Sequence, residues 1–213
     1  MKKKYYNKYW ENNIEGGTLN LPPSWSEDNL RWHSKFFKRY VGKNVLDFGC
    51  GDGTFLNHIT IDKKDIKQAV GLDLSEEAIQ IGKRKYSQIT FRQGELLDLS
   101  LRPNTFDTVF AIEVMEHLLD VDQYLEEIKK ILKKGGYLCI TTTDFNLLKK
   151  LVIAGLFWEK FFYPNNPHIR FYTRKTLADI CRKHGLEQVG YKWNKSYAGL
   201  MPKGQMSVFK KVK

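Results

Sequence analysis

Apolar residues follow two alternating patterns from residue 44 onward. Short runs rich in β-branched and aromatic residues alternate with stretches whose apolar positions recur with helical period. The first pattern predicts strands at 44–48, 68–73, 89–94, 106–112 and 136–143, and the second predicts helices near 54–61, 76–86 and 121–133. Strands that alternate with helices are typical of a parallel sheet with crossover connections. The sequence therefore predicts an α/β fold.

The chain after residue 143 follows a different order. Residues 145–162 read as one apolar helix and residues 174–184 as a second helix that ends at Gly185. Two further runs, 186–193 and 206–212, read as strands and pair as a C-terminal hairpin if they are neighbours in space.

The first forty residues are set apart by aromatic residues and chain breakers. Tyr5, Tyr6, Tyr9 and Trp10 form a cluster, and the pairs Gly16-Gly17 and Pro22-Pro23 interrupt the chain before a helical stretch at 28–40. The aromatic cluster either forms a lid or packs on the flank of the sheet.

A chain of 213 residues with 42% hydrophobic residues predicts a single domain at 1–213, divided into a lid or cap at 1–40, a core at 44–143 and a substrate-covering part at 144–213.

The net charge of +11 is confined to the two ends of the chain. Residues 1–10 hold four lysines and residues 188–213 hold six, neither with an acid, which leaves 25 basic and 24 acidic residues between them. Such a near-neutral core disfavours a nucleic-acid partner, although the basic ends keep nucleic acid and peripheral contact with an anionic membrane open.

The sequence also carries signals of location. No apolar run follows the basic start, and the longest apolar stretch, 151–158, is too short to span a bilayer. Cys50, Cys139 and Cys181 lack the CxxC spacing of zinc sites, so buried free thiols are expected. These features predict a cytoplasmic protein.

Three glycines follow the first predicted strand. Gly49, Gly51 and Gly53 have the spacing GxGxG, whereas dinucleotide-binding turns have GxGxxG. Asp47 and Asp52 bracket the turn with negative charge, which disfavours a pyrophosphate and favours a cationic ligand.

The segment Val45-Leu-Asp-Phe-Gly-Cys-Gly-Asp-Gly53 resembles motif I of class I S-adenosylmethionine-dependent methyltransferases. The resemblance extends closely over 44–143 and implies a Rossmann-like, mostly parallel seven-stranded sheet with helices on both faces and a C-terminal β-hairpin. It implies that Asp73 binds the ribose and that Leu74 lies against the adenine. The cofactor-binding residues expected in full are Asp47, Gly49, Cys50, Gly51, Asp73, Leu74, Glu95, Leu96, Ile112 and Glu113.

The segment Glu113-Val-Met-Glu116-His117 follows the fourth predicted strand. If it is helical, Glu113, Glu116 and His117 share one face, and His168 would complete a mixed oxygen and nitrogen site for Mg²⁺, Mn²⁺ or Zn²⁺. This arrangement resembles the one in ubiquinone-biosynthesis O-methyltransferases and in RNA 3′-terminal 2′-O-methyltransferases, both associated with a divalent metal. The alternative is that Glu113 touches the cofactor and the other two orient the helix.

Methyl transfer requires an aligned acceptor whose proton is removed. His117 is the first candidate for the general base and His168 the second, since imidazole titrates near neutrality. The apolar stretch at 145–162 is read as a lid over a hydrophobic acceptor, as an interfacial helix edged by lysines, or as buried packing.

These features predict a methyltransferase that acts on an oxygen, or less favourably a nitrogen, of a small metabolite, saccharide or lipid-like acceptor. An RNA 3′-terminal 2′-O-methyltransferase is the alternative enzyme. A cofactor-binding partner subunit without catalysis is the alternative of another class, and the acids at Asp47, Asp73 and Glu113 argue against it.

Overall fold

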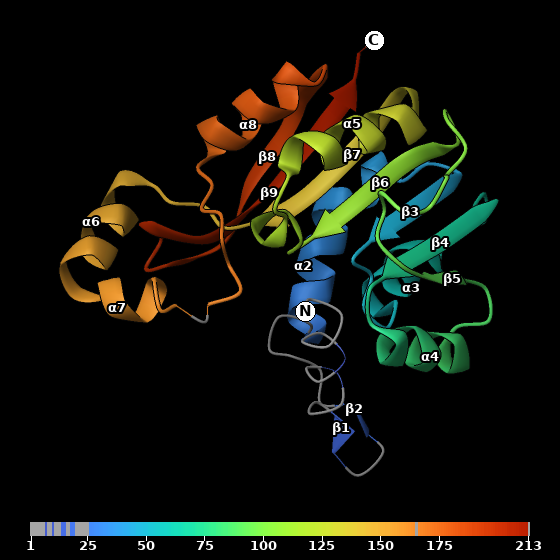
Figure 1. Ribbon diagram of the computed structural model, residues 1–213, viewed down its shortest axis with the longest axis horizontal. Coiled ribbons are helices and arrows are strands. Elements are labelled where there is room, and N and C mark those ends of the chain that lie inside the picture. Colours follow the sequence, from blue (N-terminus) through green and yellow to red (C-terminus); the bar gives the residue numbers. More distant parts are fainter. Residues whose placement is uncertain are drawn as a thin grey trace.

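The computed structural model describes Asn7, Trp10, residues 14–15 and 18–19, and residues 26–164 and 166–212. Its main sheet has seven strands in the order β5-β4-β3-β6-β7-β9-β8 (Figure 1). They are β3 (Asn44–Phe48), β4 (Gln68–Asp73), β5 (Thr90–Gln93), β6 (Phe106–Ile112), β7 (Leu132–Thr142), β8 (Leu186–Tyr197) and β9 (Met201–Lys211). The strands are parallel except β9, which runs antiparallel to β7 and β8. The predicted α/β class, mostly parallel sheet and C-terminal hairpin are confirmed.

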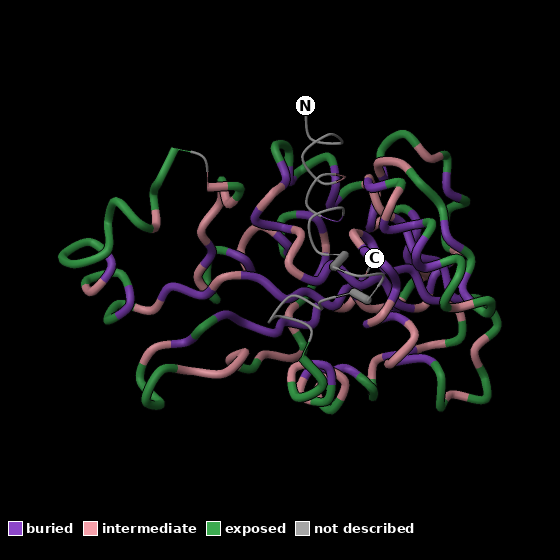
Figure 2. Tube along the Cα trace, turned by 90° about the horizontal axis from the view of Figure 1, so that it is seen from below, coloured by how far each residue is buried: buried purple, intermediate pink, exposed green. Residues whose placement is uncertain are grey.

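Helices cover both faces of this sheet because its strands bury side chains on both sides. Val45 packs in a cluster with Phe37 and Phe55, whereas its neighbour Leu46 packs in the opposite cluster with Leu125 and Leu177. The first face carries α2 (Glu27–Phe37), the short 3-10 helix η2 (Lys38–Tyr40), α3 (Thr54–Thr60) and α4 (Glu76–Lys85); the second carries α5 (Val121–Ile131) and α8 (Arg174–Lys183). Buried residues accordingly gather along the strands (Figure 2).

The stretch 145–162 departs from the prediction of one helix. It forms α6 (Leu147–Leu156) and α7 (Trp158–Phe161), separated at Phe157, whose φ of −134° lies outside the helical region. Asn146 caps the start of α6 by accepting a hydrogen bond from the Lys149 amide, so Phe145 lies outside the helix and is buried. The two helices lie at one end of the molecule, beside the outer end of the β8–β9 hairpin (Figure 1).

Several boundaries also differ by a few residues. β7 begins at Leu132, four residues before the predicted Gly136, because the backbone of Leu132 already pairs with Phe106. The hairpin strands extend further toward their connecting turn than predicted: β8 continues past residue 193 to Tyr197, and β9 begins at Met201 instead of 206 and ends at Lys211. Ser75 caps the start of α4, since its side chain accepts a hydrogen bond from the Ala78 amide.

Two smaller expectations concern the cysteines and the membrane. Cys50, Cys139 and Cys181 are free and buried, as predicted. Among the described helices, none has the length and apolar character needed to cross a bilayer.

The order of the sheet determines where a ligand can bind. The chain leaves β3 toward β4 on one side, and β6 lies on the other side of β3. At such a switch point, the loops after the two strands separate and leave a crevice at their carboxyl ends. This crevice lies after Phe48 and Ile112, where the candidate motifs begin.

Candidate functional site

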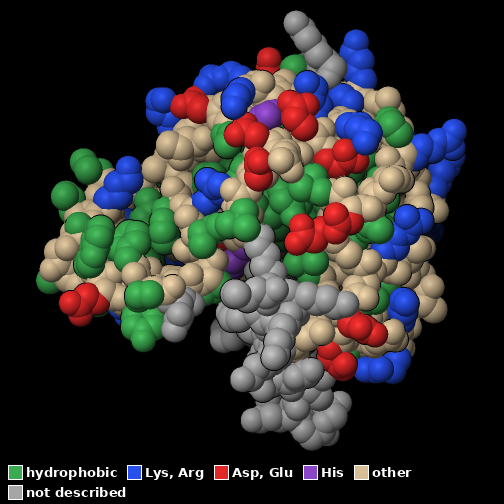
Figure 3. Space-filling view, in the orientation of Figure 1, with side chains coloured by type: hydrophobic (Ala, Val, Ile, Leu, Met, Phe, Trp, Pro, Cys, Tyr) green, Lys and Arg blue, Asp and Glu red, His purple; other side chains and the backbone are tan. Residues whose placement is uncertain are grey.

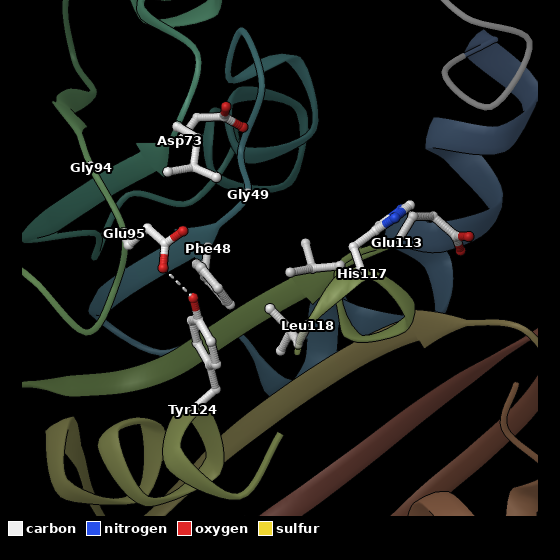
Figure 4. A pocket seen from close by; sticks show the side chains of 11 residues that line it. Phe48, Gly49, Asp73, Gly94, Glu95, Glu113, His117, Leu118 and Tyr124 are labelled. Carbon is white, nitrogen blue, oxygen red and sulfur yellow. Dashed lines mark hydrogen bonds between the residues drawn. The ribbon is translucent and has the colours of Figure 1, made fainter. Parts of the chain in front are cut away.

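A pocket opens at the carboxyl ends of β3, β4, β5 and β6 (Figure 4). We call it the cofactor pocket. It is lined by Phe48, Gly49, Asp73, Leu74, Gly94, Glu95, Glu113, Val114, His117, Leu118 and Tyr124. Five of the ten residues predicted to bind the cofactor are in this set: Gly49, Asp73, Leu74, Glu95 and Glu113.

The glycine turn brings backbone to the wall of this pocket. Gly49 has a φ of +77°, and a Cβ there would lie 2.5 Å from Cγ2 of Val114. Its amide donates a 2.7 Å hydrogen bond to the carbonyl of Leu72. A side chain at Gly49 would therefore strain the turn and fill the crevice.

Asp73 holds the turn against the next strand. Its Oδ2 accepts a 2.8 Å hydrogen bond from the Gly51 amide, and its Oδ1 accepts another of 2.8 Å from the Ser75 amide. Burial raises the pKa of this carboxyl, and the backbone donors oppose the rise. Through these hydrogen bonds, Asp73 at the end of β4 holds the glycine turn in place.

The other five predicted cofactor residues do not line the pocket. Cys50 is buried with its Sγ near the Gly51 carbonyl, and Gly51 is covered by Trp10, which lies 2.5 Å from where its Cβ would be. Leu96 belongs to the hydrophobic core, and Ile112 faces a different pocket described below.

The remaining one, Asp47, is buried beneath the turn. Its Oδ1 has no hydrogen-bond partner among the described residues. Burial raises the pKa of Asp47 to about 8, and the charge of Asp73 adds to the rise. Asp52 was expected to attract a cationic ligand. Instead it forms an ion pair with Lys85 at 2.9 Å and accepts a hydrogen bond from the Thr54 amide, so its charge is largely neutralised within the protein.

Tyr124 lines the pocket although no motif in the sequence singles it out. Its hydroxyl donates a 2.6 Å hydrogen bond to Oε2 of Glu95, and its ring stacks on Phe48 at 5.3 Å. In the sequence it occupies one of the apolar positions of α5, so periodicity assigns it only to the core. Nothing local indicates that its hydroxyl reaches the third strand.

Glu113 occupies a strained position at the end of β6. Its φ is +54°, in the left-handed region, and its amide donates to both the carbonyl and Oγ1 of Thr141 at 3.0 Å. The predicted helical face beginning at Glu113 is therefore wrong, and the 3-10 helix η3 spans only Met115–His117. Its carboxylate turns away from Asp73 and Glu95 toward α2 (Figure 4). Backbone strain of this kind is concentrated at functional sites.

Three of the four predicted metal ligands come together. One ligand atom from each of Glu116, His117 and His168 lies within 4.8 Å of the other two. Glu113 is outside this group. The His117 and His168 rings meet edge to face with centroids 4.8 Å apart.

Backbone contacts hold His168 beside His117. The amides of Ile169 and Arg170 both donate to the carbonyl of Glu116, at 3.0 and 3.2 Å. The Arg170 side chain also donates to the carbonyls of Leu118 and Leu119. Residues 168–170 are thereby held against η3.

Hydrogen bonds and burial also determine which atoms of these three side chains are able to bind a metal ion. Nδ1 of His117 lies 3.0 Å from the Pro167 carbonyl, which can only accept, so the proton is on Nδ1 and the lone pair on Nε2. Oε2 of Glu116 accepts a 2.8 Å hydrogen bond from Thr142, while Oε1 receives no hydrogen bond from an N–H or hydroxyl donor among the described residues. Burial raises the pKa of Glu116 well above its usual value, and the charge of Glu113 adds to this rise. Burial lowers the pKa of His168, which favours the neutral ring at pH 7.

A second, polar pocket lies on the other side of Glu113. It is lined by Asn29, His33, Ile112, Glu113, Asn194, Lys203 and Gly204. Burial lowers the pKa of His33, opposed by the charge of Glu113. We call it the polar pocket. The sequence predicted none of its residues except Ile112 and Glu113, because the others come from segments that meet only in the fold.

The predicted N-terminal lid can be tested only in part. Trp10 is buried against Ala78 and Ile81 and covers Gly51. Tyr5, Tyr6 and Tyr9 lie outside the described residues.

A glycine turn, an acid at the end of β4 and a strained glutamate at the end of β6 thus converge on one crevice. A family model described as a methyltransferase domain matches residues 25–190. The chain belongs to this methyltransferase family. The predicted family and its S-adenosylmethionine cofactor are thereby confirmed.

Named relatives of this methyltransferase support the same family. The chain is 30% identical over 160 residues to a ubiquinone biosynthesis O-methyltransferase of Cereibacter sphaeroides, covering 72% of this chain but only 64% of that protein. It is 29% identical to the protein of the same name from Paraburkholderia phymatum, over 84% of this chain and 78% of the relative. Among solved structures, magnesium protoporphyrin IX methyltransferase from Synechocystis, with bound SAH, superposes with a TM-score of 0.71 over 99% of this chain and 98% of that one, at 16% identity.

The residues of the methyltransferase fit its cofactor. Gly49 brings its backbone to the wall of the cofactor pocket, where no Cβ fits beside Val114. Asp73 and Glu95 add carboxylate oxygens around the cofactor pocket. A carboxylate-rich pocket of this kind suits a ligand with an ammonium and a sulfonium group.

Proposed function

We propose that this methyltransferase transfers the methyl group of S-adenosylmethionine to an oxygen of a small metabolite, saccharide or lipid-like acceptor. One observation carries the proposal: Glu113 borders both the cofactor pocket and the polar pocket. A donor in the first pocket and an acceptor in the second would meet beside Glu113. The names of the relatives, O-methyltransferases, support oxygen as the acceptor atom.

His117 is the general base in this proposal. The Pro167 carbonyl keeps the proton on Nδ1, so Nε2 accepts the proton of the acceptor hydroxyl. His168 is the second candidate, and its lowered pKa keeps it neutral and able to accept a proton. The cofactor supplies a carbon activated by the sulfonium, so no covalent enzyme intermediate is required.

We propose, as the alternative to a histidine base, that Glu116, His117 and His168 bind a divalent cation. The two roles exclude each other, because Nε2 of His117 cannot hold a cation and accept a proton at once. Two imidazoles and one carboxylate form a donor set suited to Zn²⁺ or Mn²⁺ with positions left for the acceptor. The buried Glu116 oxygen that receives no hydrogen bond from a donor fits this role, since a cation would compensate its burial. When bound, such an ion lowers the pKa of a coordinated hydroxyl and holds it in line. Glu113, the fourth predicted ligand, would not coordinate the ion; its negative charge raises the pKa of Glu116 and opposes the lowering of the pKa of His168.

The same three groups support a second candidate, an RNA 3′-terminal 2′-O-methyltransferase, because such an acceptor also presents a hydroxyl. The near-neutral core of the chain argues against it. Binding to an RNA oligonucleotide at low salt, where phosphate contacts are strongest, separates the two candidates. Failure to bind under that condition removes RNA.

The proposed function is tested with methyl-labelled S-adenosylmethionine and a panel of phenols, saccharides and lipid-linked alcohols. Labelled methyl found on oxygen by mass spectrometry, and lost in His117→Ala with cofactor binding retained, supports it. Label found on nitrogen, or transfer unaffected by the substitution, contradicts the atom or the base.

A further inference from the structure

Exposed apolar side chains gather at one end of the molecule. We call this end the arm and define it as residues 147–163, with α6 and α7, together with the hairpin end at 195–203. Its exposed large side chains are Leu147, Leu148, Leu151, Leu156, Phe157, Trp158, Phe162, Tyr163, Tyr197 and Leu200. In the rest of the described chain, only Ile61, Leu97, Leu119, Ile169 and Val189 are comparable. A patch of this kind marks an interaction surface.

The arm is an ordered unit despite this exposure. Lys149 is buried, and its Nζ donates to the carbonyls of Asp144, Pro202 and Lys203 at 3.1, 2.8 and 3.0 Å. Asn146 donates a 2.8 Å hydrogen bond to the Leu200 carbonyl. These bonds join α6 to the hairpin, so the apolar residues of both are held on one rigid support.

Internal packing accounts for only part of its apolar surface. Ile153 is buried, and Phe161 packs edge to face on Phe145 at 6.1 Å. By contrast, Leu156 is 76% exposed and Trp158 is 57% exposed. The alternative of buried packing for this stretch therefore applies to one side of α6 and α7 only.

The charged residues of the arm, which are mostly lysines, indicate what kind of partner it binds. Lys150, Lys160 and Lys203 are exposed, Lys195 is half-buried, and Glu159 is the only acid in the two segments of the arm. In the space-filling view, apolar side chains cover this end with lysines and one acidic side chain at its edges (Figure 3). Apolar and aromatic residues edged by lysines are typical of proteins that lie on anionic lipid.

A second copy of the chain fits this surface less well. A two-fold dimer through the arm would place the lysines of one copy against those of the other, which is unfavourable. Lysine is also depleted at protein interfaces relative to other surfaces. We propose that the arm docks on the surface of an anionic lipid bilayer, with its apolar side chains inserted and its lysines among the headgroups.

Docking would place the bilayer next to the reacting groups. Asn194 and Lys203, from the hairpin, line the polar pocket, and His168 follows α7 closely in the chain. An acceptor with an apolar tail would then reach the polar pocket from the bilayer; this consequence rests on the proposed function, whereas docking itself does not.

The experiment is cosedimentation of the full chain with vesicles of equal parts phosphatidylcholine and phosphatidylglycerol, and with vesicles of phosphatidylcholine alone. Binding to the mixed vesicles that decreases with salt is expected. Leu151→Asp should weaken binding about tenfold or more, whereas Ile61→Asp, an equal change at a residue with the same 63% exposure, should not. Lys160→Gln should weaken it about fivefold and the control Lys64→Gln should not.

S-adenosylmethionine binding by calorimetry shows in the same samples that each variant is folded, and it reports on the proposed function separately. Docking is overturned if the native chain fails to bind the mixed vesicles, or if arm and control variants bind equally. It is also overturned if Leu151→Asp leaves vesicle binding intact and instead converts a dimer to a monomer in light scattering, because a second copy is then the partner.

Discussion

The hydroxyl of Tyr124, on α5, lies 2.6 Å from Oε2 of Glu95, which follows β5. This hydrogen bond joins the two sides of the cofactor pocket (Figure 4) and fixes one carboxylate oxygen of Glu95. Replacement of Tyr124 by Phe retains the ring that stacks on Phe48 and removes only the donor. We expect affinity for S-adenosylmethionine to fall about tenfold, since a hydrogen bond to a charged group contributes about 1.5–3 kcal/mol. Calorimetry measures this, and unchanged affinity would show that Glu95 is positioned without Tyr124.

A second prediction concerns Asp73. Asp73→Ala removes the acceptors of the Gly51 and Ser75 amides as well as the predicted ribose contact. We expect S-adenosylmethionine binding to weaken about a hundredfold or more, which is the loss of two charge-assisted hydrogen bonds. Ser75→Ala is the control: it removes the cap of α4 and costs about 1 kcal/mol of stability with little change in affinity. Equal losses of affinity in both variants would mean that Asp73 acts only on stability.

The buried carboxyl of Asp47 gives the protein a pH-dependent stability. Its pKa is raised to about 8 in the folded chain, first by burial and then by the charge of Asp73. The stability contributed by the protonated group is present below about pH 4, where the unfolded chain is also protonated, and is lost as the pH rises toward 8. Asp47→Asn abolishes this titration, so its unfolding temperature should rise relative to the native protein between pH 5 and pH 8. A constant difference between the two over that range would contradict the raised pKa.

The polar pocket leads to a prediction about acceptor recognition. His33 and Asn194 line it but not the cofactor pocket. Asn194→Ala should therefore raise KM for the acceptor with little change in the dissociation constant of S-adenosylmethionine. Gln88→Ala, at an exposed residue that lines neither pocket and whose side chain donates to Asn57, is the control and should change neither constant. A change in cofactor affinity in Asn194→Ala would show that the two pockets are not separate.

The strands and the cofactor motif could be predicted because their signals are local. The runs at 44–48, 68–73 and 106–112 coincide with β3, β4 and β6, since buried parallel strands are apolar throughout and are bounded by polar turns. Asp73 and Gly49 were found because the end of a parallel strand is where ligands bind. In contrast, Glu113 was expected to begin a helix, and nothing in its neighbours indicates the left-handed backbone that Thr141 stabilises through two hydrogen bonds.

Long-range contacts account for what the sequence could not predict. Tyr124 meets Glu95 across 29 residues, and His33 meets the hairpin across a gap of more than 150 residues in the polar pocket. Around α7, Phe145 likewise packs on Phe161, and Phe171, from another segment, packs on Phe162 just after the helix. Periodicity predicts which residues are buried, but not which element buries them.

The cluster of Glu116, His117 and His168 predicts metal dependence. Mn²⁺ or Zn²⁺ titrated into the native chain should bind with one-to-one stoichiometry, and Glu116→Gln should weaken binding by about tenfold or more, because the amide is neutral and a poorer ligand. The substitution retains the size of the side chain and an oxygen for the Thr142 hydrogen bond. Glu27→Gln, at an exposed position, is the matched control.

Chelation of the metal should reduce methyl transfer in the native protein and leave S-adenosylmethionine binding unchanged, since Asp73 and Gly49 are not part of the cluster. Transfer at the native rate after chelation, with no heat on titration of either metal, would instead limit the Glu116 side chain to its hydrogen bond with Thr142 and leave proton removal to His117.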